Sequence, residues 1–256
     1  MCLIALAWQV SPENPLLVAA NRDEFHARPA QPAHFWEDNP GVLAGRDLQA
    51  GGTWLGVSRQ GRFAAITNIR DPDNAGPAPR SRGELTADFL RGAAPVETYL
   101  REISERVESY LGFNLLVSDG RELWYLHGVE GGEPHRLEPG VYGLSNAALD
   151  VPWPKVRIAK DALEALVAAD PNPNHEALAA CVADRTLARA DDLVGHGLEG
   201  EMAVRLSGQF IVTETYGTRC RSTLRCARRG DLRFREERFD ARGDSVGRED
   251  FFLPAP

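Results

Sequence analysis

Two apolar runs near the start of the chain, separated by turn-forming residues, constrain the fold more than any other feature of the sequence. The runs cover residues 2–8 and 16–20, and Ser11-Pro12-Glu13-Asn14-Pro15 lies between them. Serine, proline and asparagine favour turns, so the two runs are expected to pair as antiparallel strands. Pairing about residue 13 places Cys2 opposite residue 24, at the end of the polar sequence Asn21-Arg22-Asp23-Glu24.

Cys2 follows Met1 directly. A small second residue permits removal of the initiator methionine, which would give Cys2 both a thiol and a free α-amine. Because a free thiol titrates at about 8.5 and an α-amine at about 7.7–8.0, the amine is a suitable base for the thiol near neutral pH. The alternative role, and the commoner one for a cysteine near a chain start, is that of a small buried apolar residue.

The four polar residues that end the second run are candidate partners of Cys2. Side chains alternate faces along a strand, so Asn21 and Asp23 are expected on one face and Arg22 and Glu24 on the other. An arginine beside Cys2 would stabilise its thiolate, and an aspartate would hold its amine. A solvated, salt-bridged strand end would contain the same residue types.

Composition restricts the class of protein. With 256 residues, 43% of them hydrophobic, and no Pro/Gly/Ser-rich linker, the chain is expected to form a single domain over residues 1–256. The formal net charge of −8 argues against a nucleic-acid partner. The N-terminus lacks a basic region and a cleavage site, and charged residues interrupt it before any apolar run could span a bilayer. These features predict a cytoplasmic protein without a transmembrane segment.

The cysteines and histidines show no spacing typical of a disulfide framework or a metal site. No Cys-x-x-Cys or His-x-x-x-His pair is present, and the six histidines share no spacing. We therefore expect free thiols, no metal and no cofactor. The cysteines are Cys2, Cys181, Cys220 and Cys226.

The pattern of apolar residues predicts strands first, then helices, then strands again. Sheets flanked by helices on their outer faces would form an α+β layered sandwich. Hairpins are expected over residues 52–68 and 113–126, the second turning at Asp119-Gly120, and loops over residues 26–50 and 69–82. Helices are expected over residues 81–90, 96–107, 155–169 and 174–184, and further strands over residues 141–144, 209–215, 220–228 and 232–239.

An ordered set of short motifs resembles the NRDE family, also called the transport and Golgi organisation family. The resemblance runs from residue 1 to about residue 240, and the ordered set is far more specific than any one tetrapeptide. Members of that family have been connected with Golgi organisation and with lipid and haem handling. The motifs are Met1-Cys2-Leu3-Ile4, Ala20-Asn21-Arg22-Asp23-Glu24-Phe25, Arg28-Pro29, Gly51-Gly52-Thr53-Trp54-Leu55-Gly56, Thr67-Asn68, Arg82-Gly83-Glu84-Leu85, Gly112-Phe113-Asn114-Leu115, Tyr142-Gly143-Leu144-Ser145-Asn146 and Tyr216-Gly217-Thr218-Arg219.

The family is also distantly similar to N-terminal-nucleophile amidohydrolases of the bile-salt hydrolase and penicillin V acylase type. That resemblance implies a four-layer αββα sandwich and a set of site residues. Cys2 matches the nucleophile, Asn68 and Asn146 match two asparagines of the oxyanion region, and Arg219 matches a late arginine. Arg22 and Asp23 are adjacent here, whereas those enzymes commonly space the arginine and aspartate three apart, so their individual roles stay open.

Two functions of different classes follow from these expectations. The first is a cysteine N-terminal-nucleophile hydrolase that cleaves C–N bonds other than peptide bonds in a small amide or N-acyl compound after Met1 is removed. The second is a non-catalytic carrier or chaperone for haem or lipid on the same scaffold, in which Cys2 is dispensable or a soft ligand. A structural partner in trafficking is a third, weaker alternative.

Overall fold

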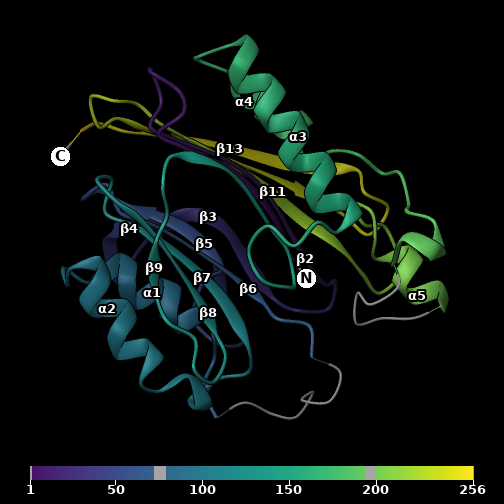
Figure 1. Ribbon diagram of the computed structural model, residues 1–256, viewed down its shortest axis with the longest axis horizontal. Helices are drawn as coiled ribbons and strands as arrows, with labels where there is room; N and C mark the ends of the chain where they lie inside the picture. Colours follow the sequence, from purple (N-terminus) through teal and green to yellow (C-terminus); the bar gives the residue numbers. More distant parts are fainter. Residues whose placement is uncertain (1, 72–78, 194–199, 256) are drawn as a thin grey trace.

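Two antiparallel sheets pack face to face with helices on both outer surfaces (Figure 1). The computed structural model describes residues 2–71, 79–193 and 200–255. The strands are β1 (Cys2–Trp8), β2 (Leu16–Phe25), β3 (Ala30–Trp36), β4 (Asn39–Asp47), β5 (Leu55–Ser58), β6 (Phe63–Asn68), β7 (Phe113–Ser118), β8 (Leu123–Gly128), β9 (His135–Arg136), β10 (Gly140–Leu144), β11 (Tyr216–Cys226), β12 (Leu232–Phe239) and β13 (Ser245–Leu253). The α-helices are α1 (Gly83–Arg91), α2 (Val96–Ser104), α3 (Pro154–Ala169), α4 (His175–Ala180) and α5 (Gly200–Arg205).

The strand order explains the layers. One sheet has the order β10-β1-β2-β11-β12-β13, and the other runs from β3 to β9 in sequence order. Helices α3 and α4 cover the first sheet, and α1 and α2 cover the second. This four-layer αββα arrangement confirms the predicted fold class. Within the described ranges, no helix is long and apolar enough to cross a membrane.

Strand β1 is buried on both faces, which accounts for its unbroken apolar sequence. Ile4, Leu6 and Trp8 belong to the core between the two sheets. Leu3 and Ala5 point the other way and pack in the core under α3 and α4. The chain start is therefore an interior strand, and Cys2 lies on the same face as the inter-sheet core.

The N-terminal hairpin forms as predicted, but its register differs by two residues. Cys2 pairs with Arg22 rather than with residue 24. The reason is that the turn begins earlier: Gln9 adopts a positive φ of 52° and its N–H donates to the carbonyl oxygen of Pro15 at 2.7 Å. An even shift preserves the alternation of faces, so the grouping of Arg22 with Glu24, and of Asn21 with Asp23, is retained.

Several other predicted elements are present. The hairpins β5–β6 and β7–β8 form, and Gly120 supplies the positive φ of 88° that the second turn needs. The side chain of Asn174 caps α4 by accepting a hydrogen bond from the N–H of Ala177 at 2.8 Å.

Two predictions of secondary structure are wrong. Residues 26–50, expected to be loop, form β3 and β4. Residues 209–215, expected to be a strand, contribute only the bridge between Val212 and Gly217, because Phe210 N–H donates instead to the carbonyl oxygen of Asp184. The edge strand β13 was not predicted at all. The expected loop at 69–82 lies partly outside the described residues.

We predict that Gly56→Ala lowers the free energy of unfolding by about 1–3 kcal/mol, because it overpacks the core. A Cβ at Gly56 would lie 2.6 Å from the Cβ of Ala44 and 2.9 Å from the carbonyl oxygen of Leu43. Urea unfolding measures the loss. Gly41→Ala is the control, since the atoms nearest its added Cβ belong to the flexible side chains of Asn39 and Gln60. Equal losses in both variants would contradict the packing explanation.

Candidate functional site

A cavity of about 330 Å³ contains Cys2 and residues of both sheets in its lining. Five of the six predicted site residues line it: Cys2, Arg22, Asp23, Asn68 and Arg219. The sixth, Asn146, donates to Asn68 and is not part of the lining formed by the described residues. The hairpin and the strand-end motifs, far apart in sequence, therefore converge on one cavity.

Thiol and guanidinium side chains alternate in a row across four strands of the first sheet. Cys2 on β1 pairs with Arg22 on β2, Arg22 pairs with Cys220 on β11, and Cys220 pairs with Arg238 on β12. All four line the cavity. The two sulfurs belong to strands two apart, roughly 10 Å at ordinary strand spacing, so they are not placed to form a disulfide.

Cys2 is 8% exposed, and the surroundings of its thiol act on the thiol pKa in both directions. Burial raises the pKa, and the Asp23 carboxylate adds to the rise. The Arg22 guanidinium and a hydrogen bond from the Asp23 backbone N–H lower it. Arg22 is therefore a group that favours the thiolate, as its position directly opposite Cys2 allows.

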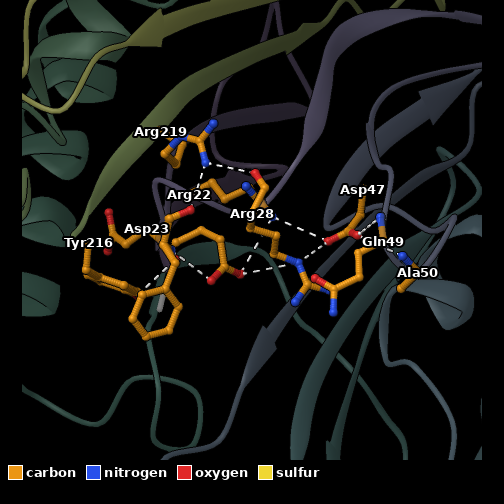
Figure 2. Close-up of polar contacts among 10 residues, drawn as sticks. Arg22, Asp23, Arg28, Asp47, Gln49, Ala50, Tyr216 and Arg219 are labelled. Atoms are coloured by element: carbon orange, nitrogen blue, oxygen red, sulfur yellow. Dashed lines mark hydrogen bonds and ion pairs between the residues drawn. The ribbon is translucent and has the colours of Figure 1, made fainter.

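Arg22 is only loosely paired with carboxylates (Figure 2). Its Nη2 lies 3.7 Å from both Glu24 Oε2 and Asp47 Oδ2. Asp47 makes a shorter contact with Arg28, whose Nε lies 2.5 Å from Oδ2. Its other oxygen accepts hydrogen bonds from the backbone N–H groups of Gln49 and Ala50, at 2.9 Å each. Asp47 thus anchors Arg28 and leaves the Arg22 charge available to the cavity.

Asp23 lies in a separate, buried polar group. Its Oδ1 accepts a hydrogen bond from Thr218 Oγ1 at 2.7 Å, and Tyr216 Oη donates to its carbonyl oxygen at 2.9 Å. Burial raises the pKa of Asp23, and the charge of Lys155 opposes that rise. Lys155 is 3% exposed, and burial lowers its pKa to about 8. Sequence reasoning missed Lys155, whose only signal was that it is one of two lysines.

A hydrogen-bond network joins the second sheet to Cys2. Tyr125 Oη donates to Asn114 Oδ1 at 2.6 Å, and Asn114 Nδ2 donates to Thr67 Oγ1 at 3.0 Å. Thr67 Oγ1 in turn donates to the carbonyl oxygen of Ser145 at 2.6 Å. Ser145 Oγ donates to the carbonyl oxygen of Cys2 at 2.8 Å. Asn114, Thr67 and Ser145 all occur in the family motifs, but their joint role was not predicted.

The two candidate oxyanion asparagines contact each other. Asn146 Nδ2 donates to both oxygens of Asn68, at 2.8 Å to the carbonyl and 2.9 Å to Oδ1. Both N–H groups of Asn146 are thereby used. Because Asn68 Oδ1 accepts from Asn146, its Nδ2 is left for the cavity, and none of the described residues accepts from it.

Two further arginines line the cavity, Arg219 from the irregularity in β11 and Arg82 from the turn before α1. Arg219 Nη1 donates to the carbonyl oxygens of Phe25 at 2.8 Å and Arg28 at 3.1 Å, holding the segment after β2 (Figure 2). Arg82 lies on the side of the second sheet, and its Nη1 donates to the carbonyl oxygen of Gly112 at 3.1 Å. Sequence reasoning used the Arg82 motif as a helix start and as a family motif, and did not place Arg82 in the site. No described group of three or more His, Cys, Asp or Glu side chains is arranged to hold a metal ion.

The fold resembles solved N-terminal-nucleophile-type hydrolases. A mutant of the conjugated bile acid hydrolase from Clostridium perfringens superposes with a TM-score of 0.54 and 9% identity, covering 98% of this chain and 92% of that one. A second variant of the same enzyme gives a TM-score of 0.51 and 11% identity, covering 100% and 98%. At these identities the likeness supports the fold alone.

Sequence comparison gives the family. A Bos taurus protein, Transport and Golgi organization protein 2 homolog, is 41% identical over 172 residues, which are 62% of each chain. The Drosophila melanogaster protein, Transport and Golgi organization protein 2, is 29% identical over 205 residues, which are 70% of each chain. The match thus spans about three fifths of the length of the bovine relative. The family model described as Transport and Golgi organisation 2 matches residues 1–241, and the chain belongs to that family.

Proposed function

We propose that this protein is a cysteine N-terminal-nucleophile amidohydrolase, in which Cys2 cleaves the C–N bond of a small amide or N-acyl compound after Met1 is removed. One observation carries the proposal: Cys2 begins an interior strand and enters a cavity where Arg22 and Asn68 are its neighbours in the lining. The similarity of the αββα fold to hydrolases of this type supports it.

The reaction follows from the groups in the cavity. The Cys2 amine takes the thiol proton, and the thiolate attacks the carbonyl carbon of the substrate. The carbonyl oxygen becomes an oxyanion that accepts a hydrogen bond from Asn68 Nδ2. The amine leaving group takes the proton from the Cys2 ammonium as the C–N bond breaks, which leaves a thioester. Water then hydrolyses the thioester, and the amine and thiol of Cys2 are restored.

Each of the other predicted residues has a distinct role in this proposal. Arg22 stabilises the thiolate, and Asp23 holds the protonated amine. Asn146 acts through Asn68: by donating to Asn68 Oδ1, it orients the Asn68 N–H groups toward the oxyanion. Arg219 positions the segment after β2 through two carbonyl oxygens. Asn146 and Arg219 are therefore positioning residues.

The charged lining of the cavity favours a polar amide substrate over the haem or lipid of the carrier hypothesis. Its side chains include arginines and carboxylates from both sheets. A site for an apolar ligand is lined mainly by hydrophobic and aromatic side chains.

The expectation of a cytoplasmic location stays a prediction.

The first test removes the nucleophile. We expect protein from its native host to lack Met1 by intact mass, and Cys2→Ala and Cys2→Ser to lose all turnover on a panel of N-acyl substrates with unchanged unfolding curves. Cys181→Ala is the control, because Cys181 lies at the C-terminal end of α4 and does not line the cavity. Quantitative retention of Met1, or full activity of Cys2→Ala, would rule out this mechanism.

A second prediction concerns the thiol pKa. Arg22→Met is expected to raise the pKa of Cys2, because an opposite charge beside the thiolate is lost. The rate of iodoacetamide alkylation at Cys2, followed against pH by peptide mass spectrometry, gives the midpoint. Arg22→Lys keeps the charge and should restore most of the shift. An unchanged midpoint in Arg22→Met would exclude Arg22 as the thiolate partner.

A third prediction separates the two asparagines. Asn68→Ala is expected to lower kcat by roughly 10²–10³-fold with little change in KM, as for the loss of one oxyanion donor. Asn146→Ala should cost less, since Asn68 remains in the cavity without its fixed orientation. Steady-state rates on a substrate found in the panel decide between them. A larger loss in Asn146→Ala than in Asn68→Ala would reverse the assigned roles.

A further inference from the structure

We propose that the substrate of the Cys2 cavity carries a carboxylate, and that Arg82 binds it. This inference deepens the proposed amidohydrolase function by specifying the class of amide: an N-acyl compound with a negative charge close to the cleaved bond. Arg82 is a specificity residue in this proposal. Three observations support this inference: the positive charge of the cavity, the ion pairs that most of its other arginines already make, and the backbone contacts that hold Arg82.

The cavity is positive although the chain is acidic. The chain has a formal net charge of −8, yet guanidinium groups outnumber carboxylates in the lining. Burial also raises the pKa of two of the carboxyl groups, Asp23 and Glu236. A concave site of one sign concentrates ligands of the opposite sign. The arginines are Arg22, Arg28, Arg46, Arg82, Arg219 and Arg238, and the acidic residues are Asp23, Glu24, Asp47 and Glu236.

Most of these arginines already have a carboxylate partner. Arg28 Nε lies 2.5 Å from Asp47, and Arg46 Nη1 lies 2.7 Å from an oxygen of Asp38. Arg238 Nη2 lies 3.4 Å from Glu249 Oε1.

Arg82 and Arg219 differ from this group. Across the described parts of the chain, neither has a carboxylate oxygen within 4.0 Å of a guanidinium nitrogen. Arg219 donates to two carbonyl oxygens of the segment that it positions. Arg82 donates to one, that of Gly112. A guanidinium has five N–H donors, so Arg82 keeps most of its donors for a ligand.

Arg82 is held in place by a close backbone crossing. Thr53 N–H donates to the carbonyl oxygen of Gly83 at 3.1 Å. A Cβ added at Gly52 would lie 2.4 Å from the carbonyl carbon of Gly83, so the two segments meet only because glycine stands there. The crossing fixes the residue before α1 at the cavity. A preorganised arginine loses less freedom when it binds a ligand than a mobile one does.

The half-buried charge of Arg82 favours an anionic ligand. Burial lowers its pKa, and the nearby Cys2 and Glu24 oppose this effect. Removing a cation from water without a counter-charge is unfavourable, and a ligand anion supplies that counter-charge. The planar guanidinium also matches a carboxylate by two parallel hydrogen bonds.

Two alkylating reagents of the same leaving group test the inference. Iodoacetate adds a carboxymethyl group to the Cys2 sulfur and iodoacetamide adds a carbamidomethyl group, in both cases as iodide leaves. Only iodoacetate carries a carboxylate. Their rate ratio at Cys2, measured by peptide mass spectrometry, is compared with the ratio for the Cys2 peptide free in solution. An effect of Arg82 on thiolate formation alters both rates equally and cancels in the ratio.

We expect the iodoacetate preference at Cys2 to exceed that of the free peptide by about tenfold at low salt, in the range of electrostatic concentration in a cleft. Arg82→Met should remove most of this preference, and Arg82→Lys should retain part of it. Arg80→Met is the matched control, because Arg80 is exposed, pairs with Glu84 and does not line the cavity. A ratio equal to that of the free peptide, a ratio unchanged in Arg82→Met, or no reaction of Cys2 with either reagent would overturn the inference.

Failure of this proposal and failure of the amidohydrolase proposal are distinguishable. Alkylation requires no hydrolysis, so a raised ratio with no turnover would leave carboxylate binding standing without the enzyme activity. If turnover is found, N-acylglycines should be cleaved at least tenfold faster, in kcat/KM, than the matched neutral N-acylglycinamides. Cleavage of both at equal rates would leave the hydrolase standing and overturn the role of Arg82.

Discussion

The burial of β1 in the interior of its sheet is the constraint on which the rest of the structure depends. Its neighbours β2 and β10 fix its position by backbone pairing, but the pairing with β10 begins only at Ile4. Where that pairing ends, the Ser145 hydroxyl donates a hydrogen bond to the carbonyl oxygen of Cys2. The Ser145 side chain thus continues the hydrogen bonding beyond the last paired residue of β10. It holds Cys2 at the cavity, where β2 pairs with this end of β1 but β10 does not.

The polar residues within apolar strands have one explanation. Thr67 and Asn114 are buried on adjacent strands of the second sheet and would be costly there without partners. Each finds its partners in the network that ends at Cys2 and Asn146. The network crosses from one sheet to the other at the cavity. Motifs that are separate in the sequence therefore belong to one hydrogen-bond network. The geometry of the site depends on how the two sheets are packed together.

Much of the fold could be predicted because local patterns determine it. The hairpins, the helices that begin near Pro95 and Pro154, and the approach of residues 21–24 to Cys2 follow from periodicity, turn residues and alternation of faces. Strands β3 and β4 were missed because prolines and short apolar runs mask their alternation. Lys155 and Arg82 could not be predicted, since their roles depend on burial and on contacts between distant segments. The orientation of Asn146 depends on side-chain geometry that spacing does not encode.

The alternation of β1 also has a consequence for how such a sequence can change over evolutionary time. Ile4, Leu6 and Trp8 anchor one face of the strand in the inter-sheet core, and Cys2 occupies the next position on that face. Insertion or deletion of one residue between Cys2 and Ile4 would turn the sulfur toward the α3 layer, and a change of two would displace it by roughly 7 Å along the strand. The length of this short segment therefore constrains the position of the sulfur more strictly than its composition does, since many apolar residues would fit the two cores.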